Sequence, residues 1–161
     1  SYKLFKEFHP RHPKIDYVTF RLGMSYYKQL PKTIDRDLKL AKDAIFYFDQ
    51  LIRSYPTSDY VGAARDFKIK CRRKLAQKEL YIADFYFIRD MYDSALLRYE
   101  KVIKEFKSAG YQPQALYGAA VSAIKTKESE KAKTYFARLS KLHAKSSELE
   151  KLQQEYGDEL K

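Results

Sequence analysis

The sequence predicts an all-α fold in which antiparallel helix pairs stack side by side. Of its 161 residues, 45% are hydrophobic and 33% are charged, a balance typical of folded helical proteins and not of disordered chains. Neither glycine nor proline occurs between Gly62 and Gly110, so long helices can form there. Small and aromatic residues also recur along the chain at helical spacing.

The recurring pattern is a small residue followed by an aromatic residue four positions later and by an apolar residue seven positions later. It occurs three times, at Ala44, Phe48 and Leu51; at Ala95, Tyr99 and Val102; and at Ala132, Phe136 and Leu139. The small residue lets a neighbouring helix approach closely, and the aromatic ring fills the groove beside it. Tyr2, Phe5 and Pro10 match the end of an earlier copy, as Phe48, Leu51 and Pro56 do in the first complete one.

A second motif precedes each copy and identifies the type of repeat. It is present as Leu22, Gly23 and Tyr26; as Ile82, Ala83 and Tyr86; and, with smaller residues, as Leu116, Ala119, Ala120 and Ala123. Together the two motifs are typical of the first and second helices of a tetratricopeptide repeat. The predicted architecture is therefore a tetratricopeptide-repeat α-solenoid of antiparallel helix pairs.

Two departures from the 34-residue period indicate insertions. Phe48 and Tyr99 lie 51 positions apart, and the extra residues after Pro56 predict one unusually long helix over about 58–89, capped by Ser58. Gly23 and Ala44 are 21 positions apart where the repeat has 12, which enlarges the loop around 28–36.

The enlarged loop ends in Asp35, Arg36 and Asp37. One aspartate is expected to cap the next helix, which leaves Arg36 to pair with a carboxylate.

The helices are predicted at about 1–8, 14–28, 36–54, 58–89, 92–106, 112–126, 128–142 and 146–157. We expect a single repeat domain over 1–161. Its parts are a remnant of a first repeat (1–10), a repeat over 14–56, a repeat with the long first helix over 58–107, a repeat over 112–143 and a capping helix within 144–161.

No catalytic or metal-binding motif is recognisable in the sequence. There is no glycine-rich phosphate loop, nucleophile elbow or paired His/Glu zinc motif. His9 and His12 each precede a proline, which favours a structural role in a loop over a metal pair. Cys71 is interpreted as a small buried hydrophobic residue, with a reactive thiol beside Arg72 as the alternative. We therefore expect no enzyme activity, cofactor or metal.

The net charge of +11 favours acidic partners. Its densest segment contains Lys68, Lys70, Arg72, Arg73, Lys74 and Lys78. This basic run is either a solvated flank or a surface for an acidic protein or lipid headgroups. Nucleic acid is not an expected partner, because neither a recognition helix nor a stacking sheet accompanies the charge.

Several less generic combinations resemble one family, in register to about residue 107. They are Pro10, His12-Pro13, Ile15-Asp16-Tyr17-Val18 and Gly23; Asp35-Arg36-Asp37, Ala41, Ala44 and Phe48; Arg53, Tyr55-Pro56, Ser58 and Tyr60; and Leu75-Ala76, Glu79, Ala83, Tyr86 and Arg89. In these segments the chain resembles the BamD family of outer-membrane β-barrel assembly lipoproteins, without the N-terminal part of that family.

The resemblance implies a non-catalytic scaffold at the periplasmic face of the outer membrane. Its implied partners are the periplasmic (POTRA) domains of BamA, other assembly lipoproteins, and the C-terminal segments of unfolded outer-membrane proteins. In the family the N-terminal repeats are associated with substrate and the C-terminal repeats with BamA. A lipidated N-terminal cysteine, absent from this chain, would hold the full-length protein on the membrane. The alternative is another tetratricopeptide-repeat adaptor of the cell envelope.

The candidate partner- or peptide-binding residues follow from the predicted inner faces and the enlarged loop. They are Tyr17, Phe20, Tyr26, Tyr27, Asp35, Arg36, Asp37, Tyr81, Phe85 and Arg89. The aromatic members can receive apolar side chains of an extended peptide. Ordinary packing between helices is the alternative role for the same rings.

Overall fold

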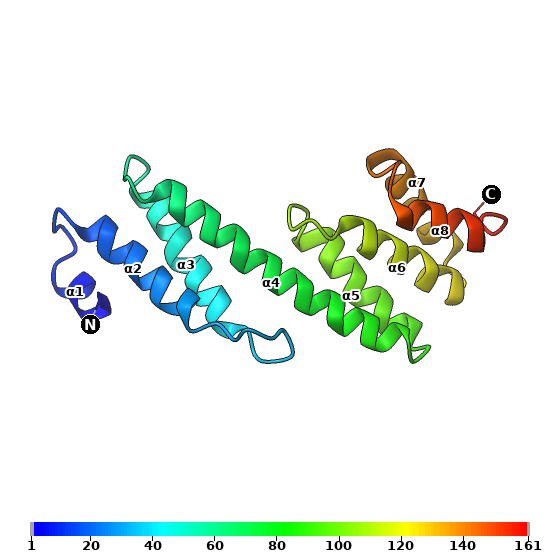
Figure 1. Ribbon diagram of the computed structural model, residues 1–161, viewed down its shortest axis with the longest axis horizontal. Helices are drawn as coiled ribbons and strands as arrows, with labels where there is room; N and C mark the ends of the chain where they lie inside the picture. Colours follow the sequence, from blue (N-terminus) through cyan, green and yellow to red (C-terminus); the bar gives the residue numbers. More distant parts are fainter. Residues whose placement is uncertain (1, 161) are drawn as a thin grey trace. The chain divides into compact units, whose positions relative to one another are not determined.

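The computed structural model describes residues 2–160 and confirms the all-α fold class (Figure 1). These residues contain eight helices and no strand. The helices are α1 (Tyr2–Phe8), α2 (Ile15–Lys28), α3 (Lys39–Ser54), α4 (Val61–Phe87), α5 (Tyr92–Glu105), α6 (Gln112–Lys125), α7 (Ser129–Leu142) and α8 (Ser147–Tyr156).

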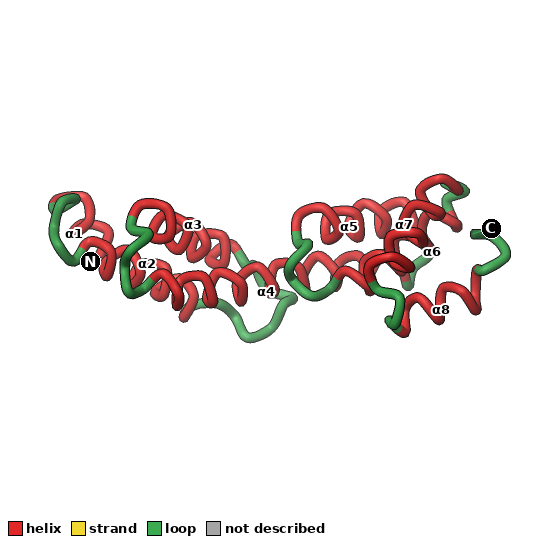
Figure 2. The backbone as a smooth tube through the Cα atoms, turned by 90° about the horizontal axis from the view of Figure 1, so that it is seen from above, coloured by secondary structure: helices red, strands yellow, loops and turns green. Residues whose placement is uncertain are grey.

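The chain divides after Leu75 into two compact units, described separately below. Figure 2 shows the helices and the loops that connect them. The first unit contains α1, α2, α3 and the N-terminal part of α4. The second contains the remainder of α4 and helices α5 to α8. Within the units, α2 pairs with α3, α5 with α6, and α6 with α7.

The core of the first unit is built around the small-to-aromatic spacing of α3. Ala44, Phe48 and Leu51 are all 0% exposed. A Cβ atom at Gly23 of α2 would lie 2.5 Å from Cε1 of Phe48, so glycine is what allows the Phe48 ring to lie against α2. Phe67 of α4 adds a third layer, its ring centroid 6.1 Å from that of Phe48. In the predicted motif, the small residue of α2 therefore allows the aromatic ring of α3 to pack directly against the α2 backbone.

The second unit repeats this device between α5 and α6. Tyr99 of α5 is 3% exposed, and a Cβ atom at Gly118 of α6 would lie 2.3 Å from its Cζ atom. The Tyr99 hydroxyl donates a hydrogen bond to Oδ1 of Asp84 at 2.6 Å. The sequence analysis did not single out Gly118. In the motif of the first helix of each repeat, the residue that corresponds to Gly23 is Ala120, two positions after Gly118.

Two helix starts differ from the prediction. Helix α3 begins at Lys39 and not near residue 36, because the buried Leu38 holds the chain at the N-cap position. Asp37, the residue before the N-cap Leu38, still contacts the start of the helix: its Oδ1 accepts a hydrogen bond from the backbone N–H of Lys39 at 2.9 Å. Helix α4 begins at Val61 and not at residue 58. Ser58 Oγ accepts the backbone N–H of Tyr60 at 3.3 Å, just before the helix, and donates to Oδ2 of Asp16 at 2.6 Å.

Cys71 is fully buried in the core of the first unit, as its small-hydrophobe interpretation predicted. Burial raises the pKa of its thiol to about 11. The thiol is therefore protonated at neutral pH and unreactive in the folded unit.

The buried hydroxyl of Ser122 on α6 is expected to lower the stability of the second unit. It is 0% exposed, and its Oγ has no hydrogen-bond partner among the described residues. Replacing Ser122 with alanine should raise the free energy of unfolding by about 1 kcal/mol, because the mutation removes a desolvated hydroxyl without opening a large cavity. Urea denaturation measures the change. Ser25→Ala is the control, since Ser25 Oγ donates to the carbonyl of Leu22 at 2.8 Å and its loss should not stabilise the fold. A destabilised Ser122→Ala variant would contradict the prediction.

Candidate binding sites

The first unit contains an apolar cavity of about 520 Å³ between α1 and α2. Its lining consists of Tyr2, Phe5, His12, Lys14, Tyr17 and Val18. Tyr2 and Phe5 stand at the repeat positions that Phe48 and Leu51 hold in α3. Those counterparts are 0% exposed, whereas Tyr2 is 37% exposed. Tyr2 is thus more exposed than the residue at the same repeat position of α3.

Positive groups border this cavity, and none of the described residues that line it carries a carboxylate. Lys14 is part of the lining. Arg21 lies beside it, with its Cζ atom 6.0 Å from the ring centroid of Tyr2 and 5.9 Å from that of Tyr17. A hydrogen bond with Tyr2 raises the pKa of the Arg21 guanidinium. The arrangement suits a ligand that combines an apolar or aromatic group with a negative charge.

Tyr17 is the one sequence-predicted residue that lines the cavity, and its surroundings hold it firmly. Its ring centroid lies 5.4 Å from that of Tyr60, which in turn stacks on Phe20 at 5.2 Å. Asp16 accepts the backbone N–H of Tyr17 at 2.7 Å and the hydroxyl of Ser58 at 2.6 Å. Residues from α2 and from the loop before α4 thus meet to position one cavity wall.

The other aromatic candidates of the first unit make the contacts of inter-helix packing. Phe20 lies 6.2 Å from Phe48, centroid to centroid. Tyr26 stacks on Tyr47 at 5.6 Å, and Tyr27 meets Phe67 edge-on at 4.8 Å. All three rings are half-buried against the core of this unit.

Asp35, Arg36 and Asp37 are exposed in the loop between α2 and α3 and do not line the cavity. The side chain of Thr33 hydrogen-bonds Asp35 and lowers the pKa of its carboxyl group. Lys74 of α4 donates to the carbonyl of Pro31 at 3.0 Å and ties this loop to the unit.

Tyr81, Phe85 and Arg89 lie in the second unit, at the end of α4 and just beyond it. Tyr81 is 50% exposed, Phe85 43% and Ile88 74%. Because they are spaced four and three residues apart, these three side chains share one helical face, here called the apolar stripe. Arg89 places its Cζ atom 3.6 Å from the Phe85 ring centroid and donates from Nη1 to the Phe85 carbonyl at 2.9 Å. The spacing of Ile88 from Phe85 was a readable signal that our sequence prediction omitted.

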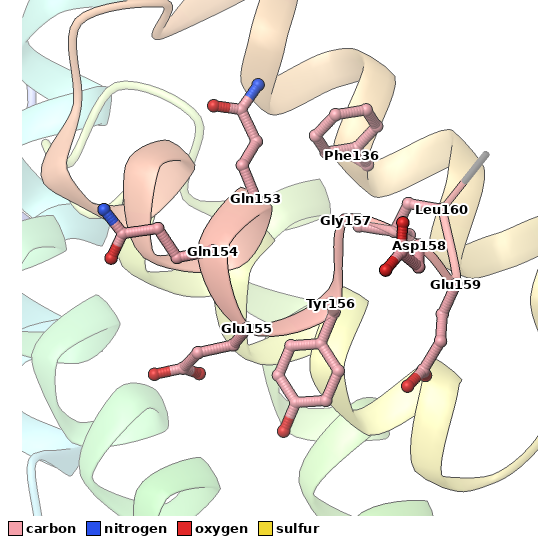
Figure 3. A pocket seen from close by; sticks show the side chains of 9 residues that line it. All are labelled: Phe136, Gln153, Gln154, Glu155, Tyr156, Gly157, Asp158, Glu159 and Leu160. Atoms are coloured by element: carbon pink, nitrogen blue, oxygen red, sulfur yellow. The ribbon is translucent and has the colours of Figure 1, made fainter.

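A second cavity, of about 510 Å³, lies near the end of the second unit (Figure 3). Phe136 of α7 and residues 153–160 line it. The carboxylates of Glu155, Asp158 and Glu159 spread apart and do not converge on one point (Figure 3). Glu155 also accepts the Tyr117 hydroxyl at 3.0 Å. Across residues 2–160 no group of three or more His, Cys, Asp or Glu side chains is placed to hold a metal ion.

Much of the basic run is engaged within the protein. Lys68 pairs with Asp49 and Lys74 with the Pro31 carbonyl, while Nζ of Lys70 lies 4.8 Å from the Phe67 ring centroid. Arg72, Arg73 and Lys78 also have interaction partners. Within residues 2–160, the helices are too short or too polar to cross a membrane.

The chain matches two protein-family models. Residues 2–116 match YfiO, an outer membrane lipoprotein family, and residues 114–146 match a tetratricopeptide-repeat family. The two matches together cover residues 2–146 and agree with the repeat pattern and the helix pairs described above.

Curated relatives carry the name outer membrane protein assembly factor BamD. The protein from Neisseria meningitidis serogroup A is 26% identical over 121 residues, which cover 70% of this chain and 45% of the relative. The Buchnera aphidicola protein is 30% identical over 70% of this chain and 49% of its own length. For Rickettsia prowazekii the identity is 28%, over 82% of this chain and 52% of the relative.

This chain spans about half the length of the relatives that it matches. The family model nevertheless covers well over half of the chain, including the cavity in the first unit and the apolar stripe in the second. The repeat motifs, the helical fold and the family match lead to one assignment: the chain belongs to the YfiO family of outer membrane lipoproteins, in which relatives are named as BamD assembly factors.

Proposed function

We propose that this chain is a non-catalytic scaffold for outer-membrane protein assembly, which binds segments of unfolded outer-membrane proteins and the periplasmic domains of BamA. The apolar cavity between α1 and α2, bordered by positive groups, is the observation that carries the proposal. The names of the relatives support the assembly role. In the full-length protein a lipid anchor holds the scaffold at the periplasmic face of the outer membrane, beside the other assembly lipoproteins.

The first unit is the proposed site for substrate. Strands of outer-membrane proteins alternate apolar and polar residues and often carry aromatic side chains. One such side chain fits between Tyr2, Phe5 and Tyr17, where ring faces from two helices are available. A C-terminal carboxylate beside it would meet the ammonium group of Lys14 instead of a like charge.

The second unit is the proposed docking site for BamA. The apolar stripe presents Tyr81, Phe85 and Ile88 on one face. Burial of such an exposed apolar cluster against a protein partner is favourable, because it removes apolar surface from water. Arg89 adds a guanidinium stacked on the same face, and arginine is among the residues enriched in protein interfaces.

Substrate binding can be measured by fluorescence because the chain contains no tryptophan. A peptide with the C-terminal sequence of an outer-membrane protein, carrying one tryptophan, should bind the wild-type chain. The Tyr17→Ala variant should weaken binding by about ten-fold, since it removes a ring that lines the cavity. Tyr27→Ala is the matched control, because Tyr27 is a tyrosine of the same helix that packs on another ring, at Phe67, but does not line this cavity. No binding by the wild type, or equal losses in both variants, would refute the substrate site.

Docking to BamA has a separate test. The double variant Phe85→Ser/Ile88→Ser should weaken retention on immobilised BamA periplasmic domains by at least about ten-fold, because it removes two exposed apolar contacts. Leu97→Ser is the control, since Leu97 of α5 is 68% exposed but is not part of the stripe. Retention that is unchanged in the double variant would exclude the stripe as the docking site.

A further inference from the structure

We infer that Arg21 is the positioning residue of the cavity: its guanidinium, held between the rings of Tyr2 and Tyr17, fixes α1 against α2 at the spacing that an aromatic ligand requires. The inference rests on the proposed use of this cavity as a binding site. It assigns to Arg21 a role in shaping the site and not in contacting the ligand.

The attachment of α1 explains why such a residue is needed. No residue of Tyr2–Phe8 is fully buried, and Phe5 and Lys6 are half-buried. Cations that face aromatic rings add contacts between α1 and the rest of the unit: Nζ of Lys3 lies 5.3 Å from the Tyr26 ring centroid, and Nζ of Lys6 lies 5.6 Å from that of Tyr47. Lys6 also hydrogen-bonds Gln50. Cation–π contacts of this kind are directional, so they set where the helix lies as well as how tightly it is held.

Of these cation–ring contacts, those of Arg21 involve the cavity walls. Tyr17 and Arg21 lie one turn apart on α2, and Tyr2 lies on α1. The Cζ atom of Arg21 is almost equidistant from the two rings, at 6.0 Å and 5.9 Å from their centroids. Both tyrosines line the cavity and Arg21 does not. Its flat guanidinium can face two rings at once, which a lysine ammonium does less well.

A second ring contact of Tyr17 limits what Arg21 controls. The ring centroid of Tyr60 lies 5.4 Å from that of Tyr17, so Tyr17 keeps a support when Arg21 is removed. Among the described residues, no second aromatic ring is in contact with Tyr2. Loss of Arg21 should therefore let Tyr2 and α1 move while Tyr17 stays, which widens the cavity and reduces its fit to a flat ligand.

Two dyes that share an aromatic framework test this role without any outer-membrane peptide. N-phenyl-1-naphthylamine is neutral, and 1-anilinonaphthalene-8-sulfonate is anionic. Titrations of the wild-type chain with each dye give dissociation constants, and loss of binding in Tyr17→Ala places the dyes in this cavity. The Arg21→Met variant should weaken the neutral dye by about five-fold, because the cavity has lost its shape, and the anionic dye by at least as much, because a neighbouring positive charge is also lost. Arg21→Lys should recover part of the affinity for both. Arg65→Met, at an exposed arginine of the same unit, should leave both constants unchanged.

Several outcomes of the dye titrations would contradict the positioning role of Arg21. A loss confined to the anionic dye would mean that Arg21 acts through its charge on the ligand, and this would overturn a positioning role. Unchanged constants in Arg21→Met, equal losses in Arg65→Met, or no dye binding by the wild type would also overturn it. Melting curves of each variant establish that the unit is folded at the titration temperature, and Arg21→Lys supplies the comparison if Arg21→Met is unfolded. If the dyes depend on Arg21 but the outer-membrane peptide does not bind, the proposed function fails and the positioning role stands.

Discussion

Replacing Gly118 with alanine should lower the free energy of unfolding by about 3 kcal/mol, because the new methyl group has no room beside Tyr99. The Cβ atom would lie between 2.3 and 2.6 Å from three atoms of the Tyr99 ring. The ring cannot easily withdraw, since Tyr99 is 3% exposed and its hydroxyl is tied to Asp84 at 2.6 Å. Burial and the bond to Asp84 both raise the pKa of Tyr99, so the ring stays neutral and in place at ordinary pH.

Chemical denaturation followed by circular dichroism measures the Gly118→Ala effect. Gly62→Ala is a matched control, because Gly62 also lies in a helix but a Cβ atom there would meet nothing within 4 Å. That control should gain up to about 1 kcal/mol from the better helix propensity of alanine. The double variant Gly118→Ala/Tyr99→Leu should be coupled, with a loss smaller than the sum of the two single losses. Equal stability of Gly118→Ala and the wild type would show that α5 and α6 do not approach as described.

Replacing Phe48 with alanine should cost the first unit about 4 kcal/mol. Phe48 is 0% exposed and lies against Gly23, with the rings of Phe20 and Phe67 centred 6.2 Å and 6.1 Å away. Truncation to alanine leaves a hole between three helices, and the surrounding rings can fill it only partly. The loss includes the ring contact to Phe20, which stacks on Tyr60 behind the cavity wall.

The thiol of Cys71 reports this loss within the first unit. In the wild type the buried thiol, with a pKa of about 11, should react very slowly with a disulfide reagent at pH 8. In Phe48→Ala the reaction should be faster, because the unit opens more often. Phe46→Ala is the control on the same helix, since Phe46 is 62% exposed and its truncation should change the rate little. Equal rates for the two variants would contradict the central position of Phe48.

Some features of the binding sites were readable from the sequence, and others required the fold. Tyr17 was a candidate because it stands in an aromatic-rich first helix, and it does line the cavity. Tyr26 and Tyr27 have the same residue type on the same helix, yet their rings pack on Tyr47 and Phe67. Sequence spacing cannot separate these cases, because the difference depends on which side of α2 is covered by α1, α3 or α4.

Ile88 and Arg21 illustrate two different reasons for an omission. Ile88 follows Phe85 at helical spacing, so its place on the apolar stripe was accessible to sequence reasoning. Arg21 was not, because nothing local distinguishes it from the other basic residues of a chain with net charge +11. Its significance comes from its contact with Tyr2, a residue on another helix.

The sequence by itself determined the helical class, the repeat type and the position of most helices, because these depend on periodic spacing of small, aromatic and apolar residues within one helix. The resemblance in its less regular segments was enough to indicate the family. Tertiary structure alone decided that Tyr99 meets Gly118, that Leu38 delays the start of α3, and that a cavity remains open between α1 and α2. Each of these depends on the distance between side chains that are remote in the sequence, and such distances follow from how whole helices pack.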